Sequence, residues 1–287
     1  MNELLANVFT AMVVDENEEN YFVQKNGQTF RLKKEEGNHV LGEAVEGFAY
    51  LDQKQKNCFT TQIPEIRRDH FGFGVVTQTR RDLGVFVDIG LSDKDVVVSL
   101  DELSEMHELW PKKGDHLMLS LRVDEKNRIW GVLADDLEFE AIRKPATEEL
   151  NNADLTGVVY RLKLVGTYVL TQDHYLGFIH PSERYKEPRL GETVQARVIG
   201  VRPDGILNLS LKPRAYEAIP DDAAMILAYL EREADQSMPY TDKSTPEEIK
   251  QKFGISKGQF KRALGHLMKQ RLIEQKEGYT RLIGKSN

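Results

Sequence analysis

The feature that most constrains this chain is an internal repeat with a spacing of about 80 residues. A Gly-Val-Val run at residues 74–76 leads, through a turn near residues 81–82, into the alternating segment 83–88. The same design returns at 157–159 and 165–170, with an aromatic residue two places after the second glycine in each copy. Alternation with period two predicts strands, and two such runs around a short turn predict a hairpin. The chain therefore contains at least two copies of one β-rich unit.

Each copy continues through another short strand, a glycine turn and two further strands. The turns are Lys113-Gly114-Asp115 and Leu190-Gly191-Glu192. Five short strands in about 65 residues predict a small closed barrel rather than a two-sheet sandwich. Residues 1–65 carry a weaker form of the pattern, with a strand-like run at 21–23 and a turn at 41–43. A third, degenerate barrel is predicted there, and the alternative is that Tyr21 and Phe22 only fill its wall.

The last segment changes to helical periodicity. A helix is predicted through residues 224–230, capped by Asp221 or Asp222. A second helix begins at Thr245 with Glu248 placed for a capping box, and it stops at Gly254. A third helix follows, and Ser256 and Gln259 form a capping-box pattern at its start. Its apolar residues recur at helical spacing until Arg271, and they are Phe260, Leu264, Leu267 and Met268. Residues 272–274 and 279–283 then predict a hairpin.

This order of helices and a hairpin resembles a winged helix, whose recognition-type helix is residues 256–270. Three cations in its first two turns give it a surface suited to phosphate contacts: Lys257, Lys261 and Arg262. Their charges, and those of Lys269 and Arg271, are also compatible with a merely solvated face. The topology is used for protein contacts as well.

Charge is unevenly distributed along the chain, although the net charge is −7. Lys and Arg outnumber Asp and Glu by 9 to 6 in residues 150–214 and by 10 to 4 in 244–287. Acids dominate elsewhere, by 11 to 6 in residues 1–65 and by 18 to 12 in 66–149. A polyanion should therefore be attracted to the C-terminal half. The acids of the helix near residues 221–233 are expected to face away from it.

The repeated units resemble S1 domains, RNA-binding members of the OB-fold class. The segment 150–214 is the better match, through Gly177-Phe178-Ile179-His180-Pro181-Ser182-Glu183, the turn at 190–192, and Leu207-Asn208-Leu209-Ser210-Leu211-Lys212. The resemblance places Tyr168 and His180 on the RNA face. Basic side chains beside that face would add attraction for phosphates, and those expected to do so are Arg161, Lys163 and Arg197. The alternative roles are a core ring for Tyr168 and a structural histidine for His180.

The second repeat departs from the S1 pattern at its RNA face. Phe86 and Arg128 occupy matching positions and are RNA-binding candidates, but Leu83 replaces an aromatic residue and Ser99 replaces the histidine. The full order of three S1-like segments and a winged helix resembles the bacterial conserved virulence factor B family. That resemblance implies a cytoplasmic RNA-binding regulator of gene expression and virulence, without catalytic activity or a cofactor.

Other classes of protein are disfavoured by the sequence. No apolar run is long enough for a membrane span, and the start of the chain does not read as a signal peptide. Cys58 is the only cysteine, so intrachain disulfides and cysteine-rich zinc sites are excluded and a reducing cytoplasm is expected. The acids Asp135, Asp136, Glu138 and Glu140 could hold a divalent metal, but acids on an exposed helix are usually only solvated. Catalytic motifs are missing, and neither a metal, a catalytic residue nor a small-molecule substrate is predicted.

The fold class predicted is a mainly β, multidomain chain of three tandem five-stranded S1/OB-type barrels followed by a small α+β winged helix. The boundaries predicted are 1–65, 66–149 with a C-terminal connecting helix, 150–214 and 215–287. The function predicted is binding of single-stranded RNA by the S1 domains, mainly the third, together with the winged helix. The alternatives are a duplex-DNA-binding transcription regulator and a scaffold that contacts the ribosome or RNA polymerase.

Overall fold

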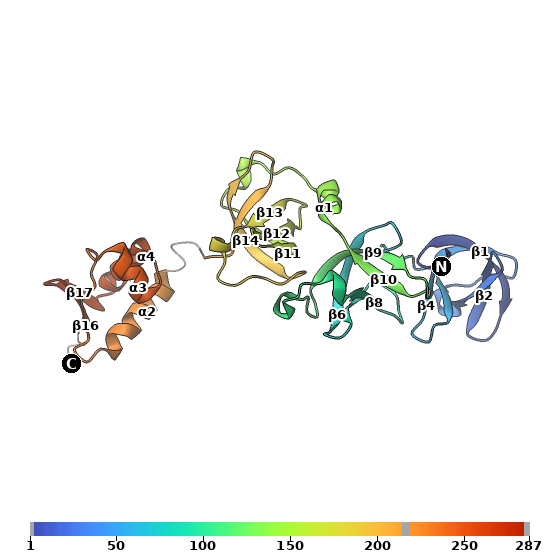
Figure 1. The fold of residues 1–287 in the computed structure, drawn as a ribbon, viewed down its shortest axis with the longest axis horizontal. Coiled ribbons are helices and arrows are strands. Elements are labelled where there is room, and N and C mark those ends of the chain that lie inside the picture. Colours follow the sequence, from blue (N-terminus) through green and yellow to red (C-terminus); the bar gives the residue numbers. More distant parts are fainter. Residues whose placement is uncertain (1–2, 214–218, 284–287) are drawn as a thin grey trace. The chain divides into compact units, whose positions relative to one another are not determined.

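The computed structural model describes residues 3–213 and 219–283, and the chain divides into two compact units between Lys212 and Pro213. The first unit contains the β-barrels and the second carries most of the helical residues (Figure 1). Within residues 3–213, the strands close into three five-stranded barrels, which confirms the fold class predicted from the repeat. In each barrel the third and fifth strands form the parallel pair, and the remaining pairs are antiparallel.

The strands have the following bounds. The first barrel contains β1 (Val8–Glu16), β2 (Asn20–Lys25), β3 (Gln28–Lys33), β4 (Ala44–Leu51) and β5 (Asn57–Thr60). The second contains β6 (Gly72–Arg80), β7 (Gly84–Asp88), β8 (Val96–Ser99), β9 (His116–Val123) and β10 (Ile129–Leu133), and is followed by helix α1 (Asp136–Ile142). The third contains β11 (Asp154–Lys163), β12 (Gly166–Thr171), β13 (Leu176–Ile179), β14 (Thr193–Val201) and β15 (Leu207–Ser210).

A β-bulge bends the first strand of each barrel. The bulges directly follow a valine: Val13, Val76 and Val159. In the third barrel the N–H of Gly191 donates to the carbonyl of Val159 at 2.7 Å, and Gly191 has a φ of +80°, which glycine adopts without steric cost. Gly42 and Gly114 make the same bond to their own valines at 2.8 Å. The glycine turns of the sequence repeat therefore dock onto the bulges.

A glycine at the start of the second strand makes room for an aromatic ring. A Cβ on Gly166 would lie 2.5 Å from the ring of Phe178 and 2.6 Å from the carbonyl of Ile179. Any larger residue would displace Phe178 from the outer surface of β13. Inside the barrel, Val159, Val169 and Leu209 are almost fully buried. Packing in the narrow core therefore fixes the positions of the strands. The strands in turn determine where the side chains of the outer face lie.

The second and third barrels are joined by polar contacts as well as by chain connectivity. The guanidinium of Arg189 pairs with the buried carboxylate of Asp115 through two hydrogen bonds of 3.1 and 3.2 Å. Backbone bonds run from His116 to Gly191 at 2.9 Å and from Leu190 to Leu109 at 3.1 Å. Two parallel bonds from one arginine fix both distance and orientation. These contacts hold β9 and the glycine turn of the third barrel side by side.

The second unit has the element order of a winged helix. Its elements are α2 (Ile219–Arg232), β16 (Ser237–Met238), α3 (Pro246–Phe253), α4 (Lys257–Lys269), β17 (Ile273–Lys276) and β18 (Tyr279–Leu282). The predicted capping boxes at Thr245 and Ser256 are both formed, and Gly254 ends α3 in the left-handed conformation. The predicted hairpin is β17–β18. Strand β16 was not predicted because two residues carry no readable period.

Three predictions about these helices were wrong. Helix α2 begins at Ile219, so Asp221 and Asp222 lie in its first turn and do not cap it. A proline at the second helical position is tolerated because the first N–H groups have no partner within the helix. Met268, which was grouped with the apolar positions of α4, is 39% exposed, and α4 ends at Lys269 because Arg271 has a φ of +58°.

Candidate nucleic-acid interface

The outer face of the third barrel carries one residue from each neighbouring strand in a continuous row. Arg161 of β11 is paired with Tyr168 of β12, Tyr168 with Phe178 of β13, and Phe178 with Asn208 of β15. The bulge after Val159 brings Arg161 into register with Tyr168. The residue between Val159 and Arg161 has no partner on β12. The row is therefore a direct result of barrel register and bulge position.

Three aromatic side chains of this face form an aromatic row, namely Tyr168, Phe178 and His180. The ring centroids of Tyr168 and Phe178 are 5.3 Å apart, and those of Phe178 and His180 are 6.5 Å apart. Tyr168 and Phe178 are half-buried, whereas His180 is exposed. The structure thus brings the predicted residues Tyr168 and His180 together through Phe178, which the sequence interpretation did not select. Phe178 precedes His180 by two residues in an extended segment, and that spacing alone would have placed both on one face.

His180 also has a structural role. Its Nδ1 accepts a hydrogen bond from the N–H of Ser182 at 3.2 Å and lies 2.8 Å from the hydroxyl of Ser182, so it caps the short 3-10 turn Pro181–Glu183. A ring nitrogen that accepts from a peptide N–H carries no proton in the neutral imidazole. The proton then resides on Nε2, which can donate to a ligand. In the second barrel, Ser99 caps the equivalent turn in the same way, by accepting from Asp101.

Two predicted cations flank the row, but both are paired with one carboxylate. The Nζ of Lys163 lies 5.1 Å from the centre of the Tyr168 ring and 2.7 Å from Asp136 of α1. The Nε of Arg161 lies 3.1 Å from the same carboxylate. A hydrogen bond from Lys163 and the charge of Arg161 lower the pKa of Asp136. A bound phosphate would therefore compete with Asp136 for these two cations.

The other acids considered as metal ligands have local partners. Asp135 caps α1 in a capping box with Glu138, and Glu140 pairs with Arg143. No group of three or more residues with metal-ligand side chains occurs among the described residues. Phe139 of the same helix is buried and stacks on Tyr160 with ring centroids 4.0 Å apart. Helix α1 therefore contacts the third barrel through both its charged and its apolar residues.

Arg197 lies apart from the aromatic row. It is paired with Asp154 at the start of β11, seven residues before Arg161 on the same strand. On its other side it is paired with Ser210 of β15. The structure therefore does not bring Arg197 together with Tyr168, Lys163 and Arg161.

A further aromatic residue with a cation lies near His180. Tyr185 is 77% exposed, and the Nζ of Lys212 lies 5.4 Å from the centre of its ring. The carbonyl of Glu183 accepts from the N–H of Leu211, which holds the two segments together. Neither residue was selected from the sequence. An exposed tyrosine two residues after a surface turn gives no functional signal in the sequence until the structure shows a cation beside its ring.

The equivalent surface of the second barrel has a different composition. Phe86 is paired with Val97, and Val97 with Trp130, so Phe86 has the register of Tyr168. Arg128 lies 5.2 Å from the Trp130 ring and 2.7 Å from Asp124. Burial opposes ionisation of Asp124, but hydrogen bonds from the backbone of Arg128, from Trp130 and from the Arg128 side chain outweigh it and lower its pKa. Arg128 is therefore held by an ionised carboxylate next to a tryptophan.

In the first barrel the equivalent surface contacts the second barrel. Register places Arg31 of β3 at the position of Phe178 and Tyr50 of β4 at the far end of the row. The hydroxyl of Tyr50 donates to Asp93 at 2.9 Å, Lys33 donates to Ser92 at 3.2 Å, and Lys94 donates to the carbonyl of Leu51. The loop between β7 and β8 therefore contacts part of this surface of the first barrel.

The predicted cations of the winged helix are on α4. Lys261 and Arg262 are exposed and Lys257 is half-buried, whereas Phe260 and Leu264 are fully buried. The apolar side of α4 therefore packs inward, as predicted.

One acid of α2 contradicts the expectation that the charges of that helix face away from these cations. Asp222 is hydrogen-bonded to Gln259 of α4 and interacts with the charge of Arg262. Burial raises the pKa of Asp222, and the charge of Arg262 opposes that effect.

The wing adds a surface that the sequence interpretation did not select. Tyr279 is 42% exposed, and the guanidinium of Arg281 lies 5.7 Å from its ring. The loop of the hairpin is Glu277-Gly278, whose φ values of +53° and +82° suit a two-residue turn.

No helix in the described part of the chain is long and apolar enough to cross a membrane.

Family models match four segments of the chain in the order of the elements above. An S1 domain matches residues 7–62, the CvfB first S1-like domain matches 71–132, the second domain of virulence regulatory factor CvfB matches 139–213, and the CvfB-like winged helix domain matches 224–282. Conserved virulence factor B of Staphylococcus epidermidis is 38% identical over 265 residues, which cover 91% of this chain and 88% of that protein. The chain belongs to the conserved virulence factor B family.

Other CvfB relatives extend the comparison. The protein YitL of Bacillus subtilis, described as uncharacterized, is 43% identical over 91% of this chain and 87% of its own length. A crystal structure from Streptococcus pneumoniae, described as a multidomain protein with nucleic acid binding domains, is 55% identical. It covers 98% of this chain and 99% of its own, with a TM-score of 0.73. The S1-like domains, the winged helix and the family together identify this CvfB member as a nucleic-acid-binding regulator.

Proposed function

We propose that this CvfB member binds single-stranded RNA, mainly through the third barrel together with the winged helix, and regulates gene expression after transcription. The observation that carries the proposal is the aromatic row of the third barrel, with the Nζ of Lys163 5.1 Å from the Tyr168 ring. Unstacked bases can lie on such rings, and each base stacked on an aromatic side chain is worth about 1 to 3 kcal/mol. Bases inside a duplex cannot reach a shallow strand surface.

Charge supports the same ligand. The third barrel and the winged helix contain the two segments with a surplus of Lys and Arg, residues 150–214 and 244–287. Phosphate neutralisation by these side chains gives an affinity that falls with salt. Of the predicted residues, Tyr168, His180, Lys163 and Arg161 form one surface, and Lys257, Lys261 and Arg262 form a second surface on α4. We propose Phe178 and Tyr185 as additional RNA contacts.

The proposal includes a non-enzymatic role without a cofactor, in the cytoplasm, and a contribution to virulence of the kind that the names of the staphylococcal relatives state. The free, buried thiol of Cys58 is compatible with a reducing compartment. The proposal also divides the chain into four domains, with boundaries near residues 65, 149 and 214. Contacts of α1 with the third barrel indicate that this helix acts with the third barrel when RNA is bound.

Titration of the full chain with three labelled nucleic acids of equal length, at one fixed salt concentration, tests the proposal. Single-stranded RNA is expected to bind most tightly, single-stranded DNA less tightly, and duplex DNA least. Tightest binding of duplex DNA would favour a transcription regulator that uses the winged helix. Absence of binding to all three would favour a scaffold that contacts the ribosome or RNA polymerase.

A further inference from the structure

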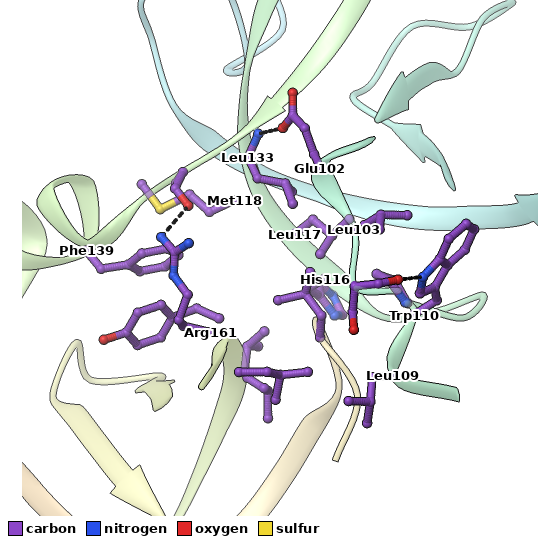
Figure 2. Close-up of a pocket in the computed structure, with 18 of the residues that line it drawn as sticks. Glu102, Leu103, Leu109, Trp110, His116, Leu117, Met118, Leu133, Phe139 and Arg161 are labelled. Carbon is purple, nitrogen blue, oxygen red and sulfur yellow. Dashed lines mark hydrogen bonds between the residues drawn. The ribbon is translucent and has the colours of Figure 1, made fainter. Parts of the chain in front are cut away.

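A cavity of about 330 Å³ lies between the second and third barrels, inside the first unit. Its walls come from β9, β10, the segment before β9, and the bulged part of β11. Figure 2 shows Phe139 and Arg161 on one side of the cavity and His116 and Trp110 on the other. The volume is at the small end of the range typical of ligand pockets, which is about 300 to 1,000 Å³. It therefore suits a single small group.

The walls combine apolar surface with a few polar atoms. Leu103, Leu117 and Leu133 supply apolar contacts. Several polar groups of the lining are already used, since the indole N–H of Trp110 donates to Ser104 and the carboxylate of Glu102 accepts from the N–H of Leu133. The Nδ1 of His116 is buried and has no hydrogen-bond partner in the described structure. A buried polar atom without a partner is costly, so this nitrogen lacks the compensation that the other polar groups of the lining have.

The aromatic row leads to this cavity. Beyond Tyr168, the ring of Tyr160 lies 6.1 Å away, and Tyr160 stacks on Phe139 at 4.0 Å. Tyr160, Arg161 and Phe139 all line the cavity. The rings of His180, Phe178, Tyr168, Tyr160 and Phe139 thus form one continuous series from the outer face of the third barrel to the cavity wall.

We propose that this interbarrel pocket takes one unstacked base of the single-stranded RNA bound along the aromatic row. The inference rests on the proposed function and adds a site to it. A base is a flat ring with polar atoms at its edge, which matches apolar walls that also include the imidazole of His116. Arg161 lies at the junction of row and pocket, where its guanidinium can pair with the phosphate of that nucleotide.

Tryptophan fluorescence can report entry of a base. The chain has two tryptophans, so Trp130→Phe leaves Trp110 in the pocket wall as the sole tryptophan. In this background we expect RNA to cause a saturable loss of Trp110 emission, with the same midpoint as binding measured by anisotropy of a labelled RNA. Uridine and adenosine monophosphates, titrated alone, provide the comparison with free nucleotides.

An abasic scan locates the base on the strand. Oligonucleotides with one abasic position each are titrated against the full chain, and one position at an end of the bound segment is expected to weaken binding about fivefold or more, equivalent to about 1 kcal/mol. Leu133→Phe fills the pocket and should abolish the effect of that one position. Leu133→Met, which keeps the volume, should preserve it. Positions that lie on Tyr168 and Phe178 should respond equally in all three proteins.

The outcomes separate the two proposals. RNA binding with unchanged Trp110 emission, or with an abasic scan that is identical in the Leu133→Phe and Leu133→Met variants, would overturn the pocket assignment and leave the proposed function intact. Free nucleotides could also reduce Trp110 emission. If RNA did not displace them, the pocket would belong to a separate nucleotide, and the pocket assignment would be overturned. No binding of RNA by the unmodified chain would overturn both.

Discussion

Tyr168 is the residue whose side chain best separates RNA binding from barrel stability. Its ring is half-buried between Phe178 and Tyr160, and Lys163 lies over it. Tyr168→Ala should weaken RNA binding by about 1 to 3 kcal/mol and leave the salt dependence nearly unchanged, because a stack and not a phosphate contact is removed. Tyr168→Phe keeps the ring and should retain most of the affinity. Affinity is measured by anisotropy, and unfolding of the alanine variant by circular dichroism would instead indicate a core role.

Asp136 limits how strongly Arg161 and Lys163 can attract phosphate. Its folded pKa is lowered, so its charge persists above the unfolded value of about 3.8 and is lost only as pH falls through the lower folded value. Its ion pairs are therefore constant between pH 6 and 8. Asp136→Asn should raise RNA affinity by up to about 1 kcal/mol, the upper range for an exposed pair, and steepen the salt dependence.

Glu140→Gln is the matched control for that change. It also removes one acid from α1, but its partner is Arg143 rather than Arg161 or Lys163. RNA affinity should then change little. An equal gain of affinity in both variants would show that the effect comes from overall charge and not from release of Arg161 and Lys163.

At the scale of elements, the first barrel has the same strand order as the third, but its outer surface contacts the second barrel. The loop between β7 and β8 bonds to Tyr50, Lys33 and the carbonyl of Leu51. Tyr50→Phe should therefore lower the free energy of unfolding of the first unit by about 1 kcal/mol and leave RNA affinity unchanged. Chemical denaturation and RNA titration of the same sample check the two parts. A loss of RNA affinity without a loss of stability would indicate that this surface binds RNA and does not only stabilise the contact between the two barrels.

The pH dependence of stability gives an additional check on Tyr50. Burial and the bond to Asp93 raise its pKa in the folded state. A raised folded pKa means that the stabilising contribution is complete below the unfolded value of about 10 and is lost as pH rises above it. The difference in stability between the unmodified chain and Tyr50→Phe should therefore shrink in alkaline solution.

Helix α4 is the element that tests the second proposed RNA surface. Changing Lys257, Lys261 and Arg262 to glutamine should lower RNA affinity broadly and flatten the salt dependence by up to about 0.7 per lost phosphate contact. Asp222→Asn should act in the opposite direction, because it removes the acid that interacts with Arg262. Unchanged affinity and salt dependence in the folded triple variant would indicate that the winged helix contacts protein instead.

The sequence predicts elements well where one residue determines backbone geometry. Gly191 and the capping boxes at Thr245 and Ser256 are local signals, and the structure has the predicted turn and helix starts at these positions. Contacts between distant segments were not predictable in the same way. Asp136 is 25 residues from Arg161 in sequence, and nothing in either segment indicates their ion pair. The spacing of Phe178 and His180 places both on one face, but the pairing of Phe178 with Tyr168 depends on cross-strand register, which the sequence does not specify.

At the scale of the whole molecule, RNA affinity should reflect two surfaces on one chain. The third barrel offers stacked rings, and the second unit offers cations on α4 and on the wing, including Arg281. When two sites on one chain bind the same strand, the second contact is effectively intramolecular, and the joint affinity exceeds that of either site. The contribution of each unit can therefore be measured by dividing the chain between Lys212 and Pro213, where the structure divides it.

A fragment of residues 3–212 keeps the aromatic row and should bind RNA more weakly, with a flatter salt dependence, because the segment with 10 Lys and Arg against 4 acids is absent. A fragment that ends at residue 149 also lacks the third barrel and should bind poorly, since acids outnumber Lys and Arg in both of its segments. Adding the separate second unit to residues 3–212 should not restore the affinity of the full chain, because the intramolecular advantage requires one covalent chain. Thermal melting shows whether each fragment is folded. Binding by residues 1–149 equal to that of the full chain would assign RNA recognition to the first two barrels.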